Sequence, residues 1–290
     1  MEKVNPRWVL GVCFILLLGL DLWSHRVVDR VDFLQVGQGD STLIVQDGTS
    51  ILIDAGPKNE YLDAGERLVW PALWRRGVRH LDAVVITHFD RDHYGGLEAL
   101  LRRTSIDRLI LVRPFGMSEA EERYYTSLGF KRDQFVVILD SERLTIGPVE
   151  LNVTPGSGGD DNLGSPYIAV SAIGEVFGFS GDAPSFLETQ WMRDGVPPAT
   201  ILKAGHHGSA DSTSASWLSY HQPKHVVFSC GRNNIWGHPD ASVVERSDAI
   251  GARIQRTDWD GTVSFRPKKS GGVELLLGEQ SFSLLEFFNR

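Results

Sequence analysis

From residue 28 onward, short apolar runs alternate with longer segments in which apolar residues recur at helical spacing. Short runs bounded by Gly, Asp or Asn predict buried strands, the first three of them at residues 31–36, 41–45 and 50–54. Glycine-containing turns are expected to join these three strands. Further strands are expected at residues 83–88, 108–112, 135–139, 167–173, 175–179, 200–203, 224–229 and 262–265, and near residue 253.

The amphipathic segments between these strands predict helices. They fall at residues 66–76, 96–103, 184–193, 214–221 and 239–250, with a Glu-rich helix starting at residue 118. Each half of the chain begins with strands and continues as a mixture of strands and helices, without a change in composition between the halves. This order predicts the α/β (α+β) class, with two packed sheets flanked by helices in a four-layer αββα sandwich over residues 28–290.

The N-terminus differs from the rest of the chain, because residues 8–20 contain no charged side chain. This apolar stretch is short for a full membrane crossing. It predicts a membrane or signal-anchor segment over residues 1–27, while a cleaved signal peptide and an apolar soluble helix are the alternatives. Lys3 and Arg7 precede it, so an anchor that keeps them inside would place the folded domain on the outer, periplasmic or extracellular, face of the cell membrane.

Composition and charge narrow the function only weakly. Of the 290 residues, 42% are hydrophobic and 23% are charged, which is typical of a globular protein. The formal net charge of −8 argues weakly against a tight binder of duplex nucleic acid, but it leaves room for an enzyme whose cations meet a phosphate locally. Cys13 and Cys230 indicate neither a disulfide framework nor a thiolate metal site, and no nucleotide cofactor is expected.

The most informative motif directly follows the apolar run at residues 83–86. Two imidazoles and two carboxylates, those of His88, Asp90, Asp92 and His93, fall within six residues. A strand that ends in such a cluster places several metal-ligand side chains at the carboxyl edge of its sheet. The alternative is a polar strand-to-helix turn in which Asp90 or Asp92 caps the next helix.

Two further apolar runs end in the same kinds of side chain. One is followed by Asp182, and the other by the adjacent pair His206 and His207. Three strand ends that deliver His or Asp to one edge of a sheet are typical of a metal site. The sequence therefore predicts that these residues meet the cluster at residues 88–93.

Together these motifs resemble those of the metallo-β-lactamase superfamily, and more narrowly those of the metallo-β-lactamase-like domain of ComEC-type DNA-uptake (competence) proteins. The resemblance extends from about residue 30 to residue 266. It includes four further segments, at residues 31–41, 52–56, 233–239 and 257–261. In that family the domain accompanies a multi-helix membrane channel. The resemblance therefore implies a DNA-channel partner, with this chain either a truncated arrangement or part of a larger protein.

The resemblance also implies two adjacent cation sites that share one carboxylate. His88 and Asp90 would hold the first cation, Asp92, His93 and His206 the second, and Asp182 would bridge the two. The cofactors implied are two divalent ions, Mn²⁺ or Zn²⁺, with Mg²⁺ a further choice, because carboxylate-rich sites favour hard cations.

This chain departs from the superfamily pattern at two points. Asp90 stands where the superfamily usually has its second histidine, and no histidine lies between His93 and His206 to supply the usual third-motif ligand. An oxygen from Asp160, Asp161 or Asn162 is one substitute, and solvent is the other. The first site is therefore expected to be rich in oxygen ligands.

Several residues near these motifs each have two interpretations. Lys203 would neutralise a phosphate or simply point to solvent, and His207 would be a cation ligand or instead a supporting or phosphate-contacting residue. Asp40 and Asp54 are expected to support the ligand loops through hydrogen bonds. The tryptophans are expected mainly in the core, although Trp236 and Trp259 lie close enough to the motifs to stack on a base. We expect His238 at the rim of the site or at a helix start.

The resemblance implies a metal-dependent hydrolase, a phosphodiesterase or nuclease that processes one DNA strand during uptake. Hydroxide would attack phosphorus, with Asp182 helping to position it and Lys203 or His207 steadying the charge. Two alternatives stay open. The first is a small-ester hydrolase of the lactonase, thioesterase or phosphocholine esterase type, because one fold supports many chemistries. The second is a catalytically degenerate module that binds DNA.

Overall fold

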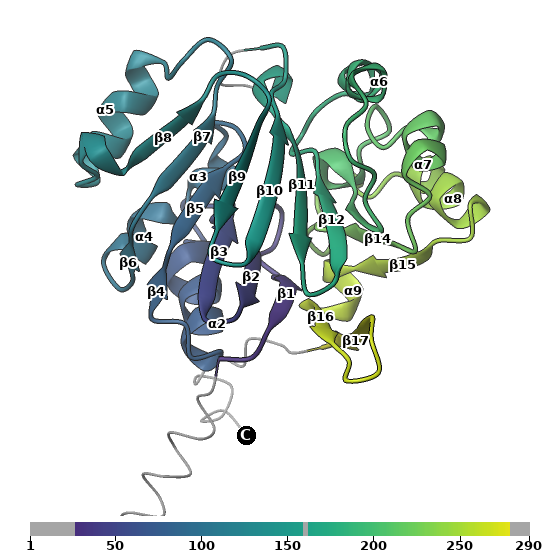
Figure 1. Cartoon of the computed structure of the whole chain (residues 1–290), viewed down its shortest axis with the longest axis horizontal. Helices are drawn as coiled ribbons and strands as arrows, with labels where there is room; N and C mark the ends of the chain where they lie inside the picture. The colour runs from purple at the N-terminus through teal and green to yellow at the C-terminus, as the bar shows by residue number, and fades with distance from the viewer. Residues whose placement is uncertain (1–26, 159–161, 279–290) are drawn as a thin grey trace, which may run out of the picture.

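Two large β-sheets pack face to face, with helices on both outer surfaces (Figure 1). The computed structural model describes residues 27–158 and 162–278. The expected membrane or signal anchor lies outside this part of the chain, apart from residue 27. None of the helices in the described ranges has both the length and the apolar character needed to span a bilayer.

Among the described residues, the first sheet has eight strands in the order β17-β16-β1-β2-β3-β5-β7-β8. Its strands are β1 (Arg30–Phe33), β2 (Thr42–Gln46), β3 (Thr49–Ile53), β5 (Ala83–Ile86), β7 (Leu109–Val112), β8 (Phe135–Ile138), β16 (Val263–Pro267) and β17 (Val273–Leu277). Strands β3, β5, β7 and β8 run parallel, and the remaining pairs are antiparallel.

The second sheet has seven strands within the same ranges, in the order β15-β14-β13-β12-β11-β10-β9. They are β9 (Glu142–Ile146), β10 (Val149–Thr154), β11 (Tyr167–Ala172), β12 (Glu175–Phe179), β13 (Ile201–Lys203), β14 (His225–Phe228) and β15 (Arg253–Arg256). Strands β12 to β15 are parallel, so both sheets have neighbouring strands whose carboxyl ends lie at one edge. A short parallel pair, β4 (His80–Leu81) and β6 (Ser105–Ile106), lies beside the first sheet.

The helices are short, and most of them connect parallel strands. The α-helices are α2 (Trp70–Arg75), α3 (Arg91–Tyr94), α4 (Leu97–Leu101), α5 (Glu119–Ser127), α6 (Ser185–Asp194), α7 (Ala215–His221), α8 (Ala241–Ala249) and α9 (Thr257–Asp260). A π-helical segment, η1 (Gly65–Val69), leads into α2, and 3₁₀ turns occur at η2 (Arg132–Gln134), η3 (Asn162–Gly164) and η4 (Gly205–Gly208).

The elements expected from the sequence are confirmed to within a few residues, but strand β17, the short strands β4 and β6, the one-turn helices α3 and α9, and one hairpin were missed. Strands β9 and β10 form this hairpin, in which Ile146 pairs with Val149. Strand β9 is an edge strand with mostly exposed polar residues, which gives a weak apolar signal. Strand β10 alternates buried and half-buried positions from Val149 to Thr154, and this period-two pattern would have identified it.

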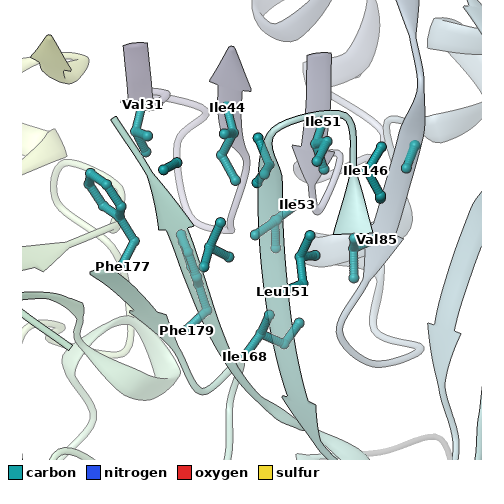
Figure 2. Packing of buried hydrophobic residues seen from close by; sticks show 14 of the residues in the cluster. Val31, Ile44, Ile51, Ile53, Val85, Ile146, Leu151, Ile168, Phe177 and Phe179 are labelled. Carbon is teal, nitrogen blue, oxygen red and sulfur yellow. The ribbon is translucent and has the colours of Figure 1, made fainter. Parts of the chain in front are cut away.

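The main core lies between the two sheets (Figure 2). In the first sheet Ile44, Ile51 and Val85 point into it, while their chain neighbours Leu52 and Val84 pack on the opposite face. This alternation explains why the sequence shows continuous apolar runs, since both faces of these strands are covered. From the second sheet the labelled side chains Ile146, Leu151, Ile168, Phe177 and Phe179 fill the other half of this core.

Two outer cores complete the expected four-layer αββα sandwich. On the first sheet, Leu73 of α2 and Leu100 of α4 join an apolar cluster with the outward side chains of β2, β3, β5 and β7. On the second sheet, Trp191 of α6, Trp217 of α7 and Val243 of α8 do the same. The helical layers therefore cover both outer faces of the paired sheets, as the sequence pattern predicts.

His221 makes the stability of the second outer core sensitive to acid. Its Nδ1 accepts a hydrogen bond of 2.8 Å from the backbone N–H of Ala199, and its ring packs against Trp217 with centroids 4.0 Å apart. Burial lowers the pKa of His221 to about 3. Because an unfolded histidine titrates near pH 6.5, the unfolded chain binds more protons between these values, and stability is lost as the pH falls through this window.

We therefore expect His221→Gln, which cannot titrate, to reduce the pH dependence of folding. The difference in unfolding free energy between the wild type and H221Q should shrink by about 2 kcal/mol from pH 6.5 to pH 5. Urea denaturation at the two pH values measures this difference. A gap that stays constant with pH would show that the buried ring is not held neutral.

Candidate metal centre

The chemically active side chains meet where strands of both sheets end. Asp54 follows β3 directly and His88 follows β5 by two residues, and these two strands are parallel neighbours in the first sheet. Asp182 follows β12, and His207 follows β13, again on parallel neighbours. The expectation that several strand ends converge on one site is met, with the two sheets contributing opposite walls.

The segment after β5 is a helix rather than an open turn. Asp92 and His93 lie within α3, and Asp90 occupies the position before it without a side-chain capping hydrogen bond. The helix-cap alternative is therefore wrong for both aspartates. A Cβ at Gly96, just after α3, would collide with the carbonyl oxygen of Ala55 at the end of β3, so this glycine permits the close approach.

Four side chains form a tight and mostly buried group, consisting of Asp92, His93, Asp182 and His207. One ligand atom from each lies within 4.8 Å of the others. The Nε2 atom of His207 lies 3.1 Å from Asp92 Oδ2 and 3.5 Å from Asp182 Oδ2. The Nε2 atom of His93 lies 3.3 Å from the other oxygen of Asp182, so this carboxylate occupies the centre of the group.

The other expected ligands surround Asp182 more loosely. His88 Nε2 lies 3.5 Å from Asp90 Oδ2 and 3.9 Å from Asp182 Oδ2. His206 Nε2 lies 3.7 Å from the same Asp182 oxygen. His206 is thus outside the tight group, and His207 takes the place beside Asp92 that the family resemblance gave to His206.

The backbone conformation explains why His207, rather than His206, lies beside Asp92. His206 and His207 both have left-handed dihedral angles, with φ of 48° and 54°. Left-handed conformations are unfavourable for residues with a Cβ and persist only where the surrounding structure holds them. Here the N–H of His206 donates to the carbonyl of Gly181, in the loop that carries Asp182, at 3.0 Å. The turn buries His207 and leaves the His206 side chain 27% exposed.

Three buried histidines are oriented by hydrogen bonds at Nδ1. The Nδ1 of His93 donates to Asp54 at 2.8 Å, and that of His207 donates to the carbonyl of Ser229 at 3.0 Å. Thr87 donates its hydroxyl to Asp54, which leaves its oxygen free to accept from Nδ1 of His88 at 3.1 Å. In each ring Nε2 therefore faces Asp182, the arrangement found in metal-binding histidines. Asp54 has the supporting role that was expected.

Some supporting residues were not predicted. Arg113 donates to the carbonyl of Thr87 at 2.9 Å and forms a buried ion pair with Glu121 at 2.7 Å. It thereby fixes the backbone that precedes His88. Arg113 directly follows the apolar strand β7, so the signal used for Asp182, a charged residue at a strand end, would also have identified it.

Lys203 forms an ion pair in the interior of the protein. It is buried, and its ammonium group is ion-paired with the carboxylate of Asp40, so the solvent-facing alternative is wrong. Burial alone would lower the pKa of Lys203, but the carboxylates of Asp40 and Asp182 outweigh burial and raise it. Burial would likewise raise the pKa of Asp40, whereas Lys203 and then His207 hold it well below its usual range.

The electrostatics of the group depend on an excess of carboxylates. Asp40, Asp54, Asp92 and Asp182 face one ammonium group, that of Lys203. Burial opposes the charged form of Asp182, but the adjacent imidazoles of His207 and His93 hold its pKa well below the ordinary value. The pKa values of these two histidines are correspondingly raised, because the carboxylates outweigh the effect of burial.

The residues present fit divalent cations. His88 Nε2, His93 Nε2 and Asp182 Oδ1 are buried and make no hydrogen bond within the described protein. Buried polar atoms without partners are rare in folded proteins, and three that converge between carboxylates form a donor set for a metal. Cations would satisfy these atoms and neutralise the carboxylates without requiring protonated histidines.

The remaining sequence interpretations have mixed outcomes. Asp160 and Asp161 lie outside the described residues, while the side-chain oxygen of Asn162 is buried without a hydrogen bond. Trp236 and Trp259 are 61% and 69% exposed, so the expectation of a core position is wrong for these two. His238 lies at the rim, with its ring 5.8 Å from that of His206.

Comparison with known proteins agrees with the motifs. Residues 34–232 match the family model described as the metallo-beta-lactamase superfamily. The chain is 30% identical to ComE operon protein 3 of Bacillus subtilis over 289 residues, covering 91% of this chain and 36% of that protein. It is 28% identical to Competence protein ComA of Neisseria gonorrhoeae over 293 residues, covering 92% of this chain and 39% of that protein. The chain thus spans little more than a third of the length of these relatives.

The solved structures confirm the fold at low sequence identity. The metallo-beta-lactamase fold protein YhfI from Bacillus subtilis aligns with a TM-score of 0.51 at 12% identity, covering 84% of this chain and 99% of that one. An identity this low supports the arrangement of the sheets and helices alone.

The buried Lys203–Asp40 pair provides a stability test of the role of Lys203. Lys203→Met should destabilise the fold by about 3–5 kcal/mol, since it leaves a buried carboxylate without its partner, and D40N/K203M should recover most of this loss. Lys224→Met is the matched control, because the Lys224 side chain is largely exposed, so its ion pair with Glu175 contributes at most about 1 kcal/mol. Urea denaturation measures all three variants. Equal stability of K203M and K224M would contradict the structural role.

Proposed function

Because the chain belongs to the metallo-β-lactamase superfamily, a superfamily of metal-dependent hydrolases, we propose that it is a phosphodiesterase that cleaves a DNA strand during competence-type DNA uptake. The observation that carries this proposal is the buried excess of carboxylates with imidazole Nε2 atoms facing Asp182. Such a centre suits two divalent cations and a phosphate oxygen between them.

Each side chain has a defined part in this proposal. Asp182 would be shared by both cations, with Asp92, His93 and His207 holding the second and His88 and Asp90 the first. Divalent cations bound there would polarise a phosphoryl oxygen and lower the pKa of coordinated water. The carboxylate oxygens favour Mn²⁺ or Mg²⁺, and the imidazoles make Zn²⁺ equally suitable.

The role of Lys203 changes in this proposal. Its ammonium group is neutralised by Asp40, so it stabilises the wall behind the cation ligands rather than contacting a phosphate. Asp40 in turn lies 3.4 Å from His207 Nδ1, which places Lys203 two contacts from the cation ligands. Bound cations, rather than Lys203, would therefore neutralise the charge of the scissile phosphate.

Substrate would reach the centre from its exposed edge. The side chains of Asp90, Asp92 and His206 are 50%, 34% and 27% exposed, whereas those of His88 and His93 are fully buried. Next to α3 is a hollow of about 420 Å³ lined by Arg91, Tyr94 and Tyr124 among others.

This hollow suits a nucleotide next to the scissile bond. Within the described residues Arg91 forms no ion pair, in contrast to Lys58 on the same wall, which is paired with Glu98 at 2.6 Å. An exposed guanidinium beside two tyrosine rings offers a phosphate contact and a stacking surface. Glu60 and Glu98 line the same hollow, so Arg91 provides one local cationic contact and does not make the hollow positive overall.

The relatives support the biological setting of the proposal. The Neisseria relative is named Competence protein ComA, and the similarity covers most of this chain. We infer that residues 1–27 anchor the domain of residues 28–290 at the cell membrane, with the metal centre on the outer face. A DNA-channel protein would then be the partner that receives the remaining single strand.

Cleavage of end-labelled single-stranded DNA by the full chain tests the proposal. We expect cleavage with Mn²⁺, Mg²⁺ or Zn²⁺, and none with EDTA. Asp182→Asn should reduce the rate by more than the roughly 10–100-fold that loss of an outer supporting residue costs, since it removes the shared ligand. Asp194→Asn, the same change at an exposed position on α6, should leave the rate unchanged.

The outcomes separate the alternative functions. Folded protein that holds two metal ions but leaves DNA intact would refute the nuclease activity and favour a small-ester hydrolase. Folded protein that neither binds metal nor cleaves DNA would favour the DNA-binding module. Equal rates for D182N and D194N would indicate a contaminating nuclease.

A further inference from the structure

The first cation site lacks a ligand that the superfamily usually supplies. His88 and Asp90 belong to this site alone, and Asp182 is shared with the second site. No histidine lies in the sequence between His93 and His206, so the usual third-motif histidine has no equivalent at its own position. A further protein ligand for this site therefore has to come from another position in the chain.

His206 occupies the open position beside the first site. Its Nε2 lies 3.7 Å from Asp182 Oδ2, and His88 Nε2 lies 3.9 Å from the same oxygen. Two ligands of a tetrahedral cation with bonds of about 2.1 Å are about 3.4 Å apart. Both imidazole nitrogens are therefore near the separation from Asp182 that binding of one cation requires.

The ring of His206 has a carboxylate on its Nδ1 side, but at a longer distance than the Nδ1 partners of the other inward-facing histidines. Its Nδ1 lies 3.7 Å from Asp211 Oδ1, an oxygen that accepts a 2.6 Å hydrogen bond from the hydroxyl of Ser209. The negative charge of this carboxylate favours a proton on Nδ1, which leaves Nε2 available to a cation.

The left-handed backbone of the loop explains how two histidines that are adjacent in the sequence can both face Asp182. Consecutive left-handed residues hold the rings of His206 and His207 with their centroids 6.1 Å apart, while their Nε2 atoms lie 3.7 Å and 3.5 Å from Asp182 Oδ2. The N–H of the preceding Gly205 donates to Thr213 Oγ1 at 2.8 Å, which holds the loop from its other side. Binding of a cation by each ring would explain why the strained backbone conformation is kept.

We propose that His206 is a ligand of the first cation, replacing the third-motif histidine, while His207 serves the second. This assignment rests on the proposed metal centre, but it concerns which residue holds which ion. It requires no particular substrate.

Metal content of the full chain tests this assignment without an activity assay. The wild type, His206→Ala and His238→Ala are loaded with Mn²⁺, passed through a desalting column and analysed by elemental mass spectrometry and Mn²⁺ EPR. H238A is the matched control, because its ring neighbours His206 at the rim. Circular dichroism confirms that each variant is folded.

We expect two ions and a spin-coupled pair in the wild type and in H238A. His206→Ala should retain one ion with the spectrum of isolated Mn²⁺, and its affinity for the other ion should fall at least tenfold. Two ions held by H206A with wild-type affinity would overturn the assignment alone. A wild-type chain without bound metal would overturn both the metal centre and the assignment.

Discussion

The structure depends on a concentration of buried carboxylates between the ends of two sheets. Asp40, Asp54, Asp92 and Asp182 lie within a few ångströms of imidazoles and one ammonium group, in a region from which water is largely excluded. Buried charges of one sign are tolerated only when counter-charges neutralise them. Protons on His93 and His207 do so without metal, and divalent cations would do so with metal. The excess of negative charge lowers the stability of the folded state, and the same excess makes the centre suited to binding cations.

The sandwich provides the rigidity that such a centre needs. Parallel strands in each sheet deliver ligands at their carboxyl ends, and three apolar clusters fix the sheets and helices relative to each other. Hydrogen bonds that the rings donate to Thr87, to the carbonyl of Ser229 and to Asp54 then orient them, while Arg113 holds the backbone next to His88. A ligand set built on strand ends is more precise than one built on free loops, because packing limits its movement.

The centre combines buried imidazoles with more exposed side chains at its edge. The rings of His88, His93 and His207 are buried, whereas the side chains of Asp90, Asp92 and His206 are 50%, 34% and 27% exposed. The exposed edge permits a phosphate to approach, and the buried rings keep the shared carboxylate in place. The exposed Arg91 lies between Asp90 and Asp92 in the sequence and lines the tyrosine-containing hollow next to α3.

The sequence by itself determined the layered fold and the segments that make the centre, because period-two apolar runs and charged strand ends are local signals. It identified His88, Asp92, His93 and Asp182 as residues of one centre, and the structure brings them together. Only the tertiary structure decided between His206 and His207, since that choice depends on two left-handed residues held by Gly181. It also decided that Lys203 faces Asp40, because the direction of a strand side chain relative to a distant loop depends on how the sheets pack. The local sequence pattern therefore identifies the residues of the site, while long-range packing determines which side chains contact each other.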